Sequence, residues 1–211
     1  MNTFDETTEP TGRARQKQET ARAVLEAARA EFERVGFDAA NLRTIAARAG
    51  VSAGTIIHHY GDKQQLLHAA LFADLEEALA NAVRDVGPAP LEAQLSRLGR
   101  AVFGYYQARP ALSRALLRES LFAQGEWAER FEGQVTHVHA VIARLTADAV
   151  ERGELREGTD GPLFAVAWLS FFYFALIAWV QGGCAAPETR VERLVAQHLE
   201  GLRPERNRSR R

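Results

Sequence analysis

The sequence predicts an all-α fold, and two features of its composition support that prediction. The helix-forming residues Ala, Leu, Arg and Glu fill most segments, and no long stretch alternates polar and apolar residues as a half-buried strand does. Apolar residues make up 46% and charged residues 25% of the 211 positions, which is ordinary for a globular protein. This length suits one large domain or two small ones.

Cysteine usage and the start of the chain favour a cytoplasmic protein. Cys184 is the single cysteine, so no disulfide can form within the chain, as expected in a reducing compartment. The first residues are polar and acidic and show no apolar core of a signal peptide. We expect residues 1–12, which contain Pro10 and Gly12, to form a disordered tail.

The first helices are predicted from apolar spacing and from residues that start or end a helix. One apolar face repeats with helical spacing from residue 21 to 32, and Gly36 ends this first helix as a C-cap would. Asn41 and Ser52 are expected to cap two short helices. Gly50 separates them, because glycine takes left-handed dihedrals at little cost. Asp62 is expected to start a longer helix.

The rest of the chain predicts five further helices and a division into a head and a body. Gly87, Pro88 and Pro90 mark the end of the helix that Asp62 starts. Further helices are expected at 91–108, 110–121, 126–152, 162–181 and 188–202. The expected domains are a head at 13–61, a helical body at 62–203 and a basic C-terminal tail at 204–211.

The predicted head has the charge and the motif of a nucleic-acid-binding domain. Residues 11–63 contain 9 Lys and Arg against 6 Asp and Glu, whereas residues 64–202 contain 12 against 17. A basic head on an acidic body indicates that the head meets a polyanion. Its segment LRTIAARAGVSAGTIIHHY, residues 42–60, predicts a helix-turn-helix, in which two short helices meet at Gly50 and small Ala46 allows a close crossing.

The second short helix of this motif is expected to enter the major groove of DNA. Ser52 caps it, and small Ala53 and Gly54 let its backbone N–H groups approach a phosphate. Arg43 and His58 are expected to reach base edges, or phosphates at the rim of the groove. Four side chains are expected to donate to phosphates: Thr44, Thr55, His59 and Lys63.

The adjacent histidines His58 and His59 are not spaced as a helical metal pair. Neighbours on a helix project about 100° apart, whereas metal pairs stand three or four positions apart. His137 and His139 are also badly spaced for a metal. The remaining alternatives for His58 and His59 are DNA contact or a solvated helix end. Because the sequence offers no organised nucleophile–base pair either, we expect no metal, no cofactor and no enzymatic activity.

The stretch TIAARAGVSAGTIIHHYGDKQQLL, residues 44–67, resembles the DNA-binding signature of the TetR family of bacterial transcription regulators. The likeness runs from about Gln16 to Leu71 and includes the turn at Gly36 and Phe37. It implies about nine helices, three of them in the head. It also implies a body that binds a small-molecule effector and a homodimer that forms through the last two helices.

The resemblance also implies roles for particular residues of the head. By this likeness, the phosphate-contacting positions are those of Thr44, Thr55, His59 and Lys63. One residue departs from the pattern, because Ile57 stands where the family very often has a tyrosine that contacts the DNA. The departure removes a hydroxyl donor. The operator sequences that other members of the family recognise therefore cannot be assigned directly to this protein.

Residues 163–180 form an uncharged stretch that is long enough to span a membrane. Pro162, Gly182 and Gly183 border it, and no basic cluster stands beside either end. We therefore expect a helix buried in the protein and no membrane insertion, since a helix that is apolar all round can also lie in a core. In the resemblance this is the eighth helix, with one side toward a ligand cavity and the other toward a dimer partner.

Aromatic residues of the body predict a mostly apolar or aromatic effector. For each of them, simple core packing is the alternative to ligand contact. The expected pocket residues are Phe103, Tyr106, Phe122, Trp127, Trp168, Phe171 and Phe172, with Arg114 and His137 as polar anchors. We predict a repressor that the effector releases from a pseudo-palindromic DNA operator. The alternatives are an activator or a ligand-independent regulator of the same fold, or a helical enzyme or metal-binding protein.

Overall fold

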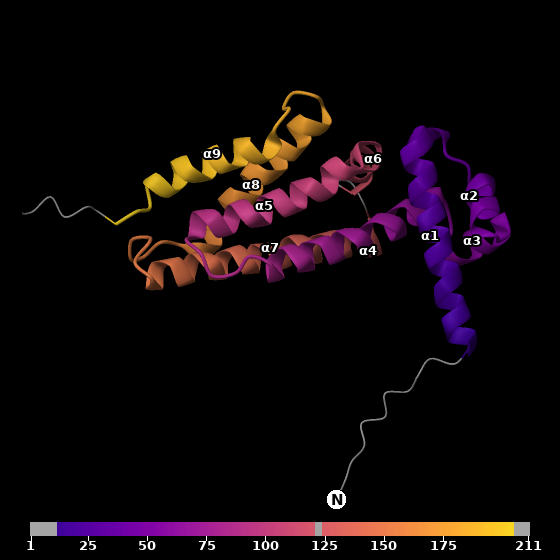
Figure 1. Ribbon diagram of the computed structural model, residues 1–211, viewed down its shortest axis with the longest axis horizontal. Coiled ribbons are helices and arrows are strands. Elements are labelled where there is room, and N and C mark those ends of the chain that lie inside the picture. The colour runs from indigo at the N-terminus through magenta and orange to yellow at the C-terminus, as the bar shows by residue number, and fades with distance from the viewer. Residues whose placement is uncertain (1–11, 121–123, 205–211) are drawn as a thin grey trace, which may run out of the picture. The chain divides into compact units, whose positions relative to one another are not determined.

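The computed structural model describes residues 12–120 and 124–204, and these residues form nine helices and no strand (Figure 1). The helices are α1 (Gly12–Ala39), α2 (Leu42–Ala49), α3 (Ala53–Tyr60), α4 (Lys63–Arg84), α5 (Leu91–Ala108), α6 (Pro110–Ser120), α7 (Glu126–Glu151), α8 (Gly161–Val180) and α9 (Pro187–Glu200). The all-α prediction is therefore confirmed. From α5 to α9 the observed bounds differ from the expected ones by at most two residues.

The contacts divide the chain into two compact units between Leu71 and Phe72, which we call the head unit and the body unit. This division falls within α4, later than the boundary expected after Gly61. Leu66 and Leu67 explain the difference, because both are fully buried at the start of α4. The predicted tails, apart from Gly12 at the start of α1 and Pro204, lie outside the described residues.

The head unit is built on α1, which packs against α2, while α2 packs against α3. Helix α1 is broken at Gly36 (φ 79°, ψ 162°), where the sequence placed its end, and a last helical turn continues to Ala39. The positive φ at this position favours glycine, because a Cβ there is strained. The core of the unit contains Phe32 from α1, Ile45 from α2 and Ile56 from α3, each at most 1% exposed.

Each predicted helix start in the head is confirmed by a side-chain hydrogen bond. The side chains of Asn41, Ser52 and Asp62 accept from backbone N–H groups two or three residues further on, at 2.8, 3.0 and 2.8 Å. Gly50 takes the left-handed conformation (φ 70°, ψ 27°) that lets the chain reverse between α2 and α3. The caps satisfy N–H groups that a helix leaves unpaired, so the short helices have defined starts.

A buried carboxylate joins α1 to α2. Glu31 is 2% exposed and accepts hydrogen bonds from Arg34 at 2.8 Å and from Arg48 of α2 at 3.1 Å. The hydrogen bond from Arg34 lowers the pKa of the Glu31 carboxyl below its ordinary value. The second arginine adds to this effect, while burial opposes it. The carboxylate therefore stays charged and fixes the helix-turn-helix on α1.

The body unit is centred on α8, which packs against α7 on one side and α9 on the other, while α9 also packs on α5. Trp168 and Phe172 are among its buried residues, whereas Leu163, Val166 and Phe174 are 65%, 51% and 61% exposed. By length and composition, α8 is the helix of the described chain that is apolar enough to cross a membrane. Its contacts with α7 and α9 cover part of the apolar surface of α8 within the protein.

Candidate DNA-binding surface and ligand cavity

Helix α3 has an exposed outer face, and one buried residue holds the helix in the core of the head unit. Ile56 packs inward at 1% exposure, whereas Ile57, His58 and His59 are exposed. At the start of the helix the hydroxyls of Ser52 and Thr55 lie 2.9 Å apart and form a hydrogen bond. The anchor and the cap fix the direction of the side chains, so the outer face of α3 is available to a partner.

Most of the predicted DNA-contacting residues lie on the surface of the helix-turn-helix. Arg43 and Thr44 are exposed in the first turn of α2, and Ala53 and Thr55 are half-buried at the start of α3. A Cβ built on exposed Gly54 meets only the hydroxyl of Ser52, at 3.6 Å, so the backbone there is open to close approach.

The two histidine rings of α3 lie against each other at its C-terminal end. The ring centroids of His58 and His59 are 5.2 Å apart in an edge-to-face arrangement, and both residues are exposed. Within the described ranges, no group of three or more His, Cys, Asp or Glu side chains is placed to hold a metal ion. The arrangement leaves both rings open to a partner outside the chain.

A groove of about 480 Å³ runs between α1 and α3. Arg13, Gln16 and Lys17 line it from α1, and Thr55 and His59 line it from α3. Two cationic side chains therefore stand beside two of the predicted phosphate donors, as an anionic backbone requires. Sequence reasoning missed Gln16 and Lys17. The helical spacing of Arg13 and Lys17 could have indicated this basic face, because the two residues lie one turn apart on the side of α1 that also carries Gln16.

Lys63, a predicted phosphate donor, is held by contacts within the head. Its ammonium donates to the backbone carbonyl oxygens of Phe37, Asp38 and Ala40 at 2.8, 3.0 and 3.2 Å, and it lies 4.7 Å from the centre of the Phe37 ring. An ammonium has three donors, and all three are used here. In this conformation Lys63 therefore has no donor left for a phosphate, and it holds the end of α1 against the start of α4.

A small cavity lies inside the body unit between α4, α5, α7 and α8. Its volume is about 40 Å³, and three of the predicted pocket residues line it, namely Tyr106, Trp168 and Phe172. Phe131, Gln134 and Tyr173 also line it. Phe131 was not among the predicted pocket residues. Gln134 gave no signal, because one amide on a helix is ordinary.

The other predicted pocket residues do not line this cavity. Phe103 is fully buried behind Phe172, with ring centroids 4.4 Å apart, and Trp127 packs against Phe72 at 5.4 Å. Phe171 lies beside His198 of α9. Arg114 and His137 are exposed, and Phe122 lies outside the described residues. A one-dimensional pattern does not distinguish the inner side of a helix from the side that contacts its next neighbour.

The polar groups around the cavity are held away from water. Burial raises the pKa of the Tyr106 hydroxyl far above its ordinary value and raises the pKa of Tyr173 to about 12. The buried side-chain nitrogen of Gln134 has no hydrogen-bond partner among the described residues. The cavity is therefore apolar, with a few polar groups of the kind that orient a ligand.

An exposed helix-turn-helix on a helical body with an internal cavity defines a class of proteins, the DNA-binding regulators. Comparisons with known proteins indicate which family of DNA-binding regulators the chain resembles. The family model of bacterial regulatory proteins of the tetR family matches residues 24–70. The HTH-type transcriptional repressor KstR of Mycolicibacterium smegmatis is 28% identical over 179 residues, 82% of each chain. KstR of Rhodococcus jostii is 29% identical over 189 residues, 87% of this chain and 81% of that protein.

A solved structure supports the same assignment at the level of the fold. A TetR transcription regulator from Haloarcula marismortui superposes with a TM-score of 0.74 at 19% identity, over 88% of this chain and 98% of that one. Residues 24–70 thus carry the match to the TetR family of bacterial regulatory proteins, and the fold is similar to that of a TetR transcription regulator.

Proposed function

We propose that this protein is a cytoplasmic transcriptional repressor that binds operator DNA as a homodimer and leaves it when a small molecule binds the body. The observation that supports this most strongly is the head, where the exposed face of α3 adjoins a groove lined by Arg13 and Lys17. The KstR relatives are transcriptional repressors, which favours a regulator over an enzyme.

The DNA contacts we propose follow from what is exposed in the head. Helix α3 enters the major groove, and its N-terminal N–H groups face a phosphate. Thr44, Thr55 and His59 donate to phosphates, joined by Lys17, while Arg43 and His58 reach toward base edges. Ile57, 53% exposed, offers only apolar contact, for example to a thymine methyl group.

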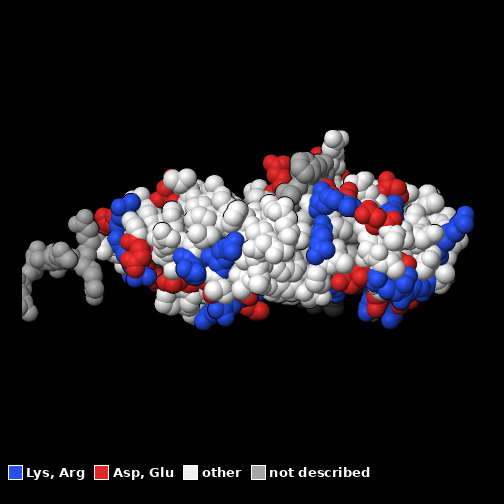
Figure 2. All heavy atoms as spheres, turned by 90° about the horizontal axis from the view of Figure 1, so that it is seen from above, with Lys and Arg blue, Asp and Glu red and all other residues white. Residues whose placement is uncertain are grey.

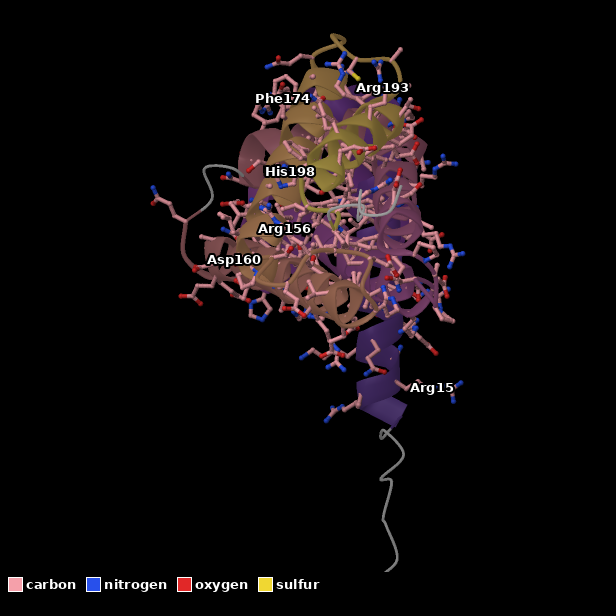
Figure 3. The ribbon with its side chains drawn as sticks, turned by 90° about the vertical axis from the view of Figure 1, so that its left-hand side faces the viewer. Arg15, Arg156, Asp160, Phe174, Arg193 and His198 are labelled. Atoms are coloured by element: carbon pink, nitrogen blue, oxygen red, sulfur yellow. The ribbon has the colours of Figure 1, made fainter. Side chains whose placement is uncertain are left out.

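The dimer we propose uses the outer side of α8 together with α9. Leu163, Val166 and Phe174 are large apolar side chains that stand exposed along α8. Figure 3 labels Phe174 of α8 and His198 of α9, and Figure 2 shows a broad area without Lys, Arg, Asp or Glu on the face seen there. Burial of such a surface favours association, and a symmetric pair of subunits would present two heads to a pseudo-palindromic site.

The effector we propose is small and largely apolar or aromatic, and it binds in the cavity lined by Tyr106 and Phe172. A cavity of about 40 Å³ is far smaller than an ordinary ligand site, which has roughly 300–1,000 Å³. The effector therefore has to select a more open arrangement of α4, α5, α7 and α8. By binding that arrangement more tightly than the closed one, it shifts the population away from the DNA-binding state.

Gel-shift titration with the DNA upstream of the protein's own gene tests this function. A sequence-specific complex at moderate salt is expected, and its absence would refute DNA recognition by the head. A reporter fused to that DNA, compared between a deletion strain and its parent, separates repression from activation, since a repressor lowers expression. Native mass spectrometry of freshly purified protein tests for a bound effector.

A further inference from the structure

The body unit contains a second and larger hollow, separate from the internal cavity. A groove of about 440 Å³ lies between α5, α8 and α9. This volume is within the range of ligand sites, roughly 300–1,000 Å³. Its floor is formed by Leu95, Gly99, Trp168, Val191 and Val195. None of the exposed apolar residues of α8, which we assign to the dimer, lines this groove.

The floor of the groove contains an unpaired hydrogen-bond donor. Trp168 is 2% exposed, and its indole Nε1 has no hydrogen-bond partner among the described residues. An indole N–H can only donate, and buried ones usually find an acceptor. The stacked ring of Phe172 lies beside the indole at a centroid distance of 5.3 Å. The donor therefore needs an acceptor that residues 12–120 and 124–204 do not supply.

Gly99 leaves the groove open beside the edge of the Trp168 indole that contains Cζ2. A Cβ built on Gly99 would stand 3.6 Å from Cζ2 of Trp168, the ring atom next to the carbon that bears Nε1. This is an ordinary contact distance, so a methyl group fits there without a clash. Any other residue at position 99 would place its side chain against this edge. The absent side chain therefore opens the groove beside the indole ring whose N–H is buried and unpaired among the described residues.

The rim of the groove carries more negative than positive charge. Glu92, Glu188 and Glu192 line it, against one cation, Arg100. Glu192 accepts from Arg100 at 2.6 Å, which lowers the pKa of its carboxyl. Glu92 pairs with an arginine outside the groove, Arg203, at 3.3 Å. Glu188 accepts at 3.1 Å from the neutral amide of Gln107 and interacts with Arg100 only at longer range, so it is the one of the three glutamates without a direct ion pair among the described residues.

We propose that the groove between α5, α8 and α9 binds a small amphipathic cation. Its flat apolar part lies over Gly99, an acceptor atom takes the N–H of Trp168, and its ammonium group faces Glu188. Trp168 lines both this groove and the internal cavity, so a ligand here touches the wall of the proposed effector site. The proposal does not depend on DNA binding or on the effector proposed above.

Nuclear magnetic resonance of the indole N–H groups tests this site in the full-length protein. The sequence has three tryptophans, and the Trp168→Phe variant assigns the Trp168 signal. The probe is para-methoxyphenethylamine, which has an ether oxygen, an aromatic ring and an ammonium. The matched anion is para-methoxyphenylpropionate. We expect a saturable shift of the Trp168 signal with a dissociation constant of about 1 mM or less for the amine, and about tenfold weaker binding of the anion.

Two glycines of α5 give a matched pair of variants. Gly99→Ala adds a methyl group over Trp168, whereas a Cβ on exposed Gly104 meets nothing within 4 Å. Both changes raise helix propensity equally. Gly99→Ala should weaken the amine about tenfold and Gly104→Ala should leave it unchanged, while Glu188→Gln should weaken the amine and not the anion. Each of three results would overturn the proposal. These are equal binding of the amine to both glycine variants, equal binding of the amine and the anion, and no shift of the Trp168 signal.

Discussion

Replacing Lys63 by Met tests which of two roles this residue has. Met keeps an unbranched side chain over the Phe37 ring but removes the ammonium that donates to three carbonyl oxygens. If those hydrogen bonds are the function of Lys63, the head loses stability and keeps its DNA contacts. If the ammonium binds a phosphate, as the family resemblance implied, the head stays stable and loses DNA affinity.

The size of the stability loss follows from the surroundings of the three hydrogen bonds. The carbonyl of Asp38 is exposed, and water replaces the ammonium there at little cost. The carbonyls of Phe37 and Ala40 are part-buried, and each loses a bond worth about 1 kcal/mol net. The expected loss is about 2 kcal/mol. Because about 1.4 kcal/mol is a factor of ten, this corresponds to about 30-fold less protection of core amides.

Amide hydrogen exchange and salt-dependent DNA binding together separate the two roles. Exchange at the amide of Ile45, which donates to Asn41 within the head core, should accelerate about 30-fold in Lys63→Met. The matched control is Lys17→Met, which removes an exposed ammonium from the groove beside α3. It should leave exchange unchanged and lower the slope of log affinity against log salt by about one per head.

One pattern of results would refute this reasoning about Lys63. If Lys63→Met keeps wild-type exchange and lowers the salt slope as Lys17→Met does, the ammonium leaves the carbonyls of α1 and contacts DNA. The phosphate role implied by the resemblance would then be correct.

Three further predictions concern the core, the dimer and the DNA surface. Because hydrogen bonds from arginines lower the pKa of Glu31, its contribution to stability is present above the ordinary carboxyl pKa and is lost as pH falls through the lowered one. Urea unfolding of the Glu31→Gln head should therefore depend less on acid pH than wild type. Exposed Glu26→Gln is the control, and equal slopes would contradict the prediction. Phe174→Asp places a charge on the proposed dimer face and should give monomers in analytical ultracentrifugation. Ala101→Asp, on the exposed side of α5, should not, and an intact Phe174→Asp dimer would place the interface elsewhere. Ile57→Tyr supplies a hydroxyl on an exposed position and should raise DNA affinity in gel shifts about tenfold, or about 1.4 kcal/mol. Unchanged affinity would mean that the DNA does not reach this residue.

The sequence was sufficient to predict the head because its signals there are local. The caps Asn41 and Ser52 and the turn glycine Gly50 each act within a few residues, so their types and spacing determine the two short helices. The inward position of Ile56 follows from the same periodicity. Such features do not need knowledge of distant contacts.

The hydrogen bonds of Lys63 and the lining of the cavity were not predictable in this way. The acceptors of Lys63 are backbone carbonyls 23 to 26 residues earlier, and backbone groups leave no trace in a residue pattern. Helix α8 is apolar on nearly all sides, so its sequence does not distinguish Phe172, which faces the cavity, from Phe171, which faces α9. Both outcomes depend on which helices become neighbours.

Hydroxyl-radical footprinting of the protein on the DNA upstream of its own gene tests the central claim most directly. Two heads related by a symmetry axis should protect two patches of backbone, with centres about 34–36 Å or a multiple of that distance apart. The patches should weaken together in Lys17→Met. A chain that retards this DNA without protecting any defined position, or that protects a single patch, would contradict recognition of an operator by a pair of helix-turn-helix heads.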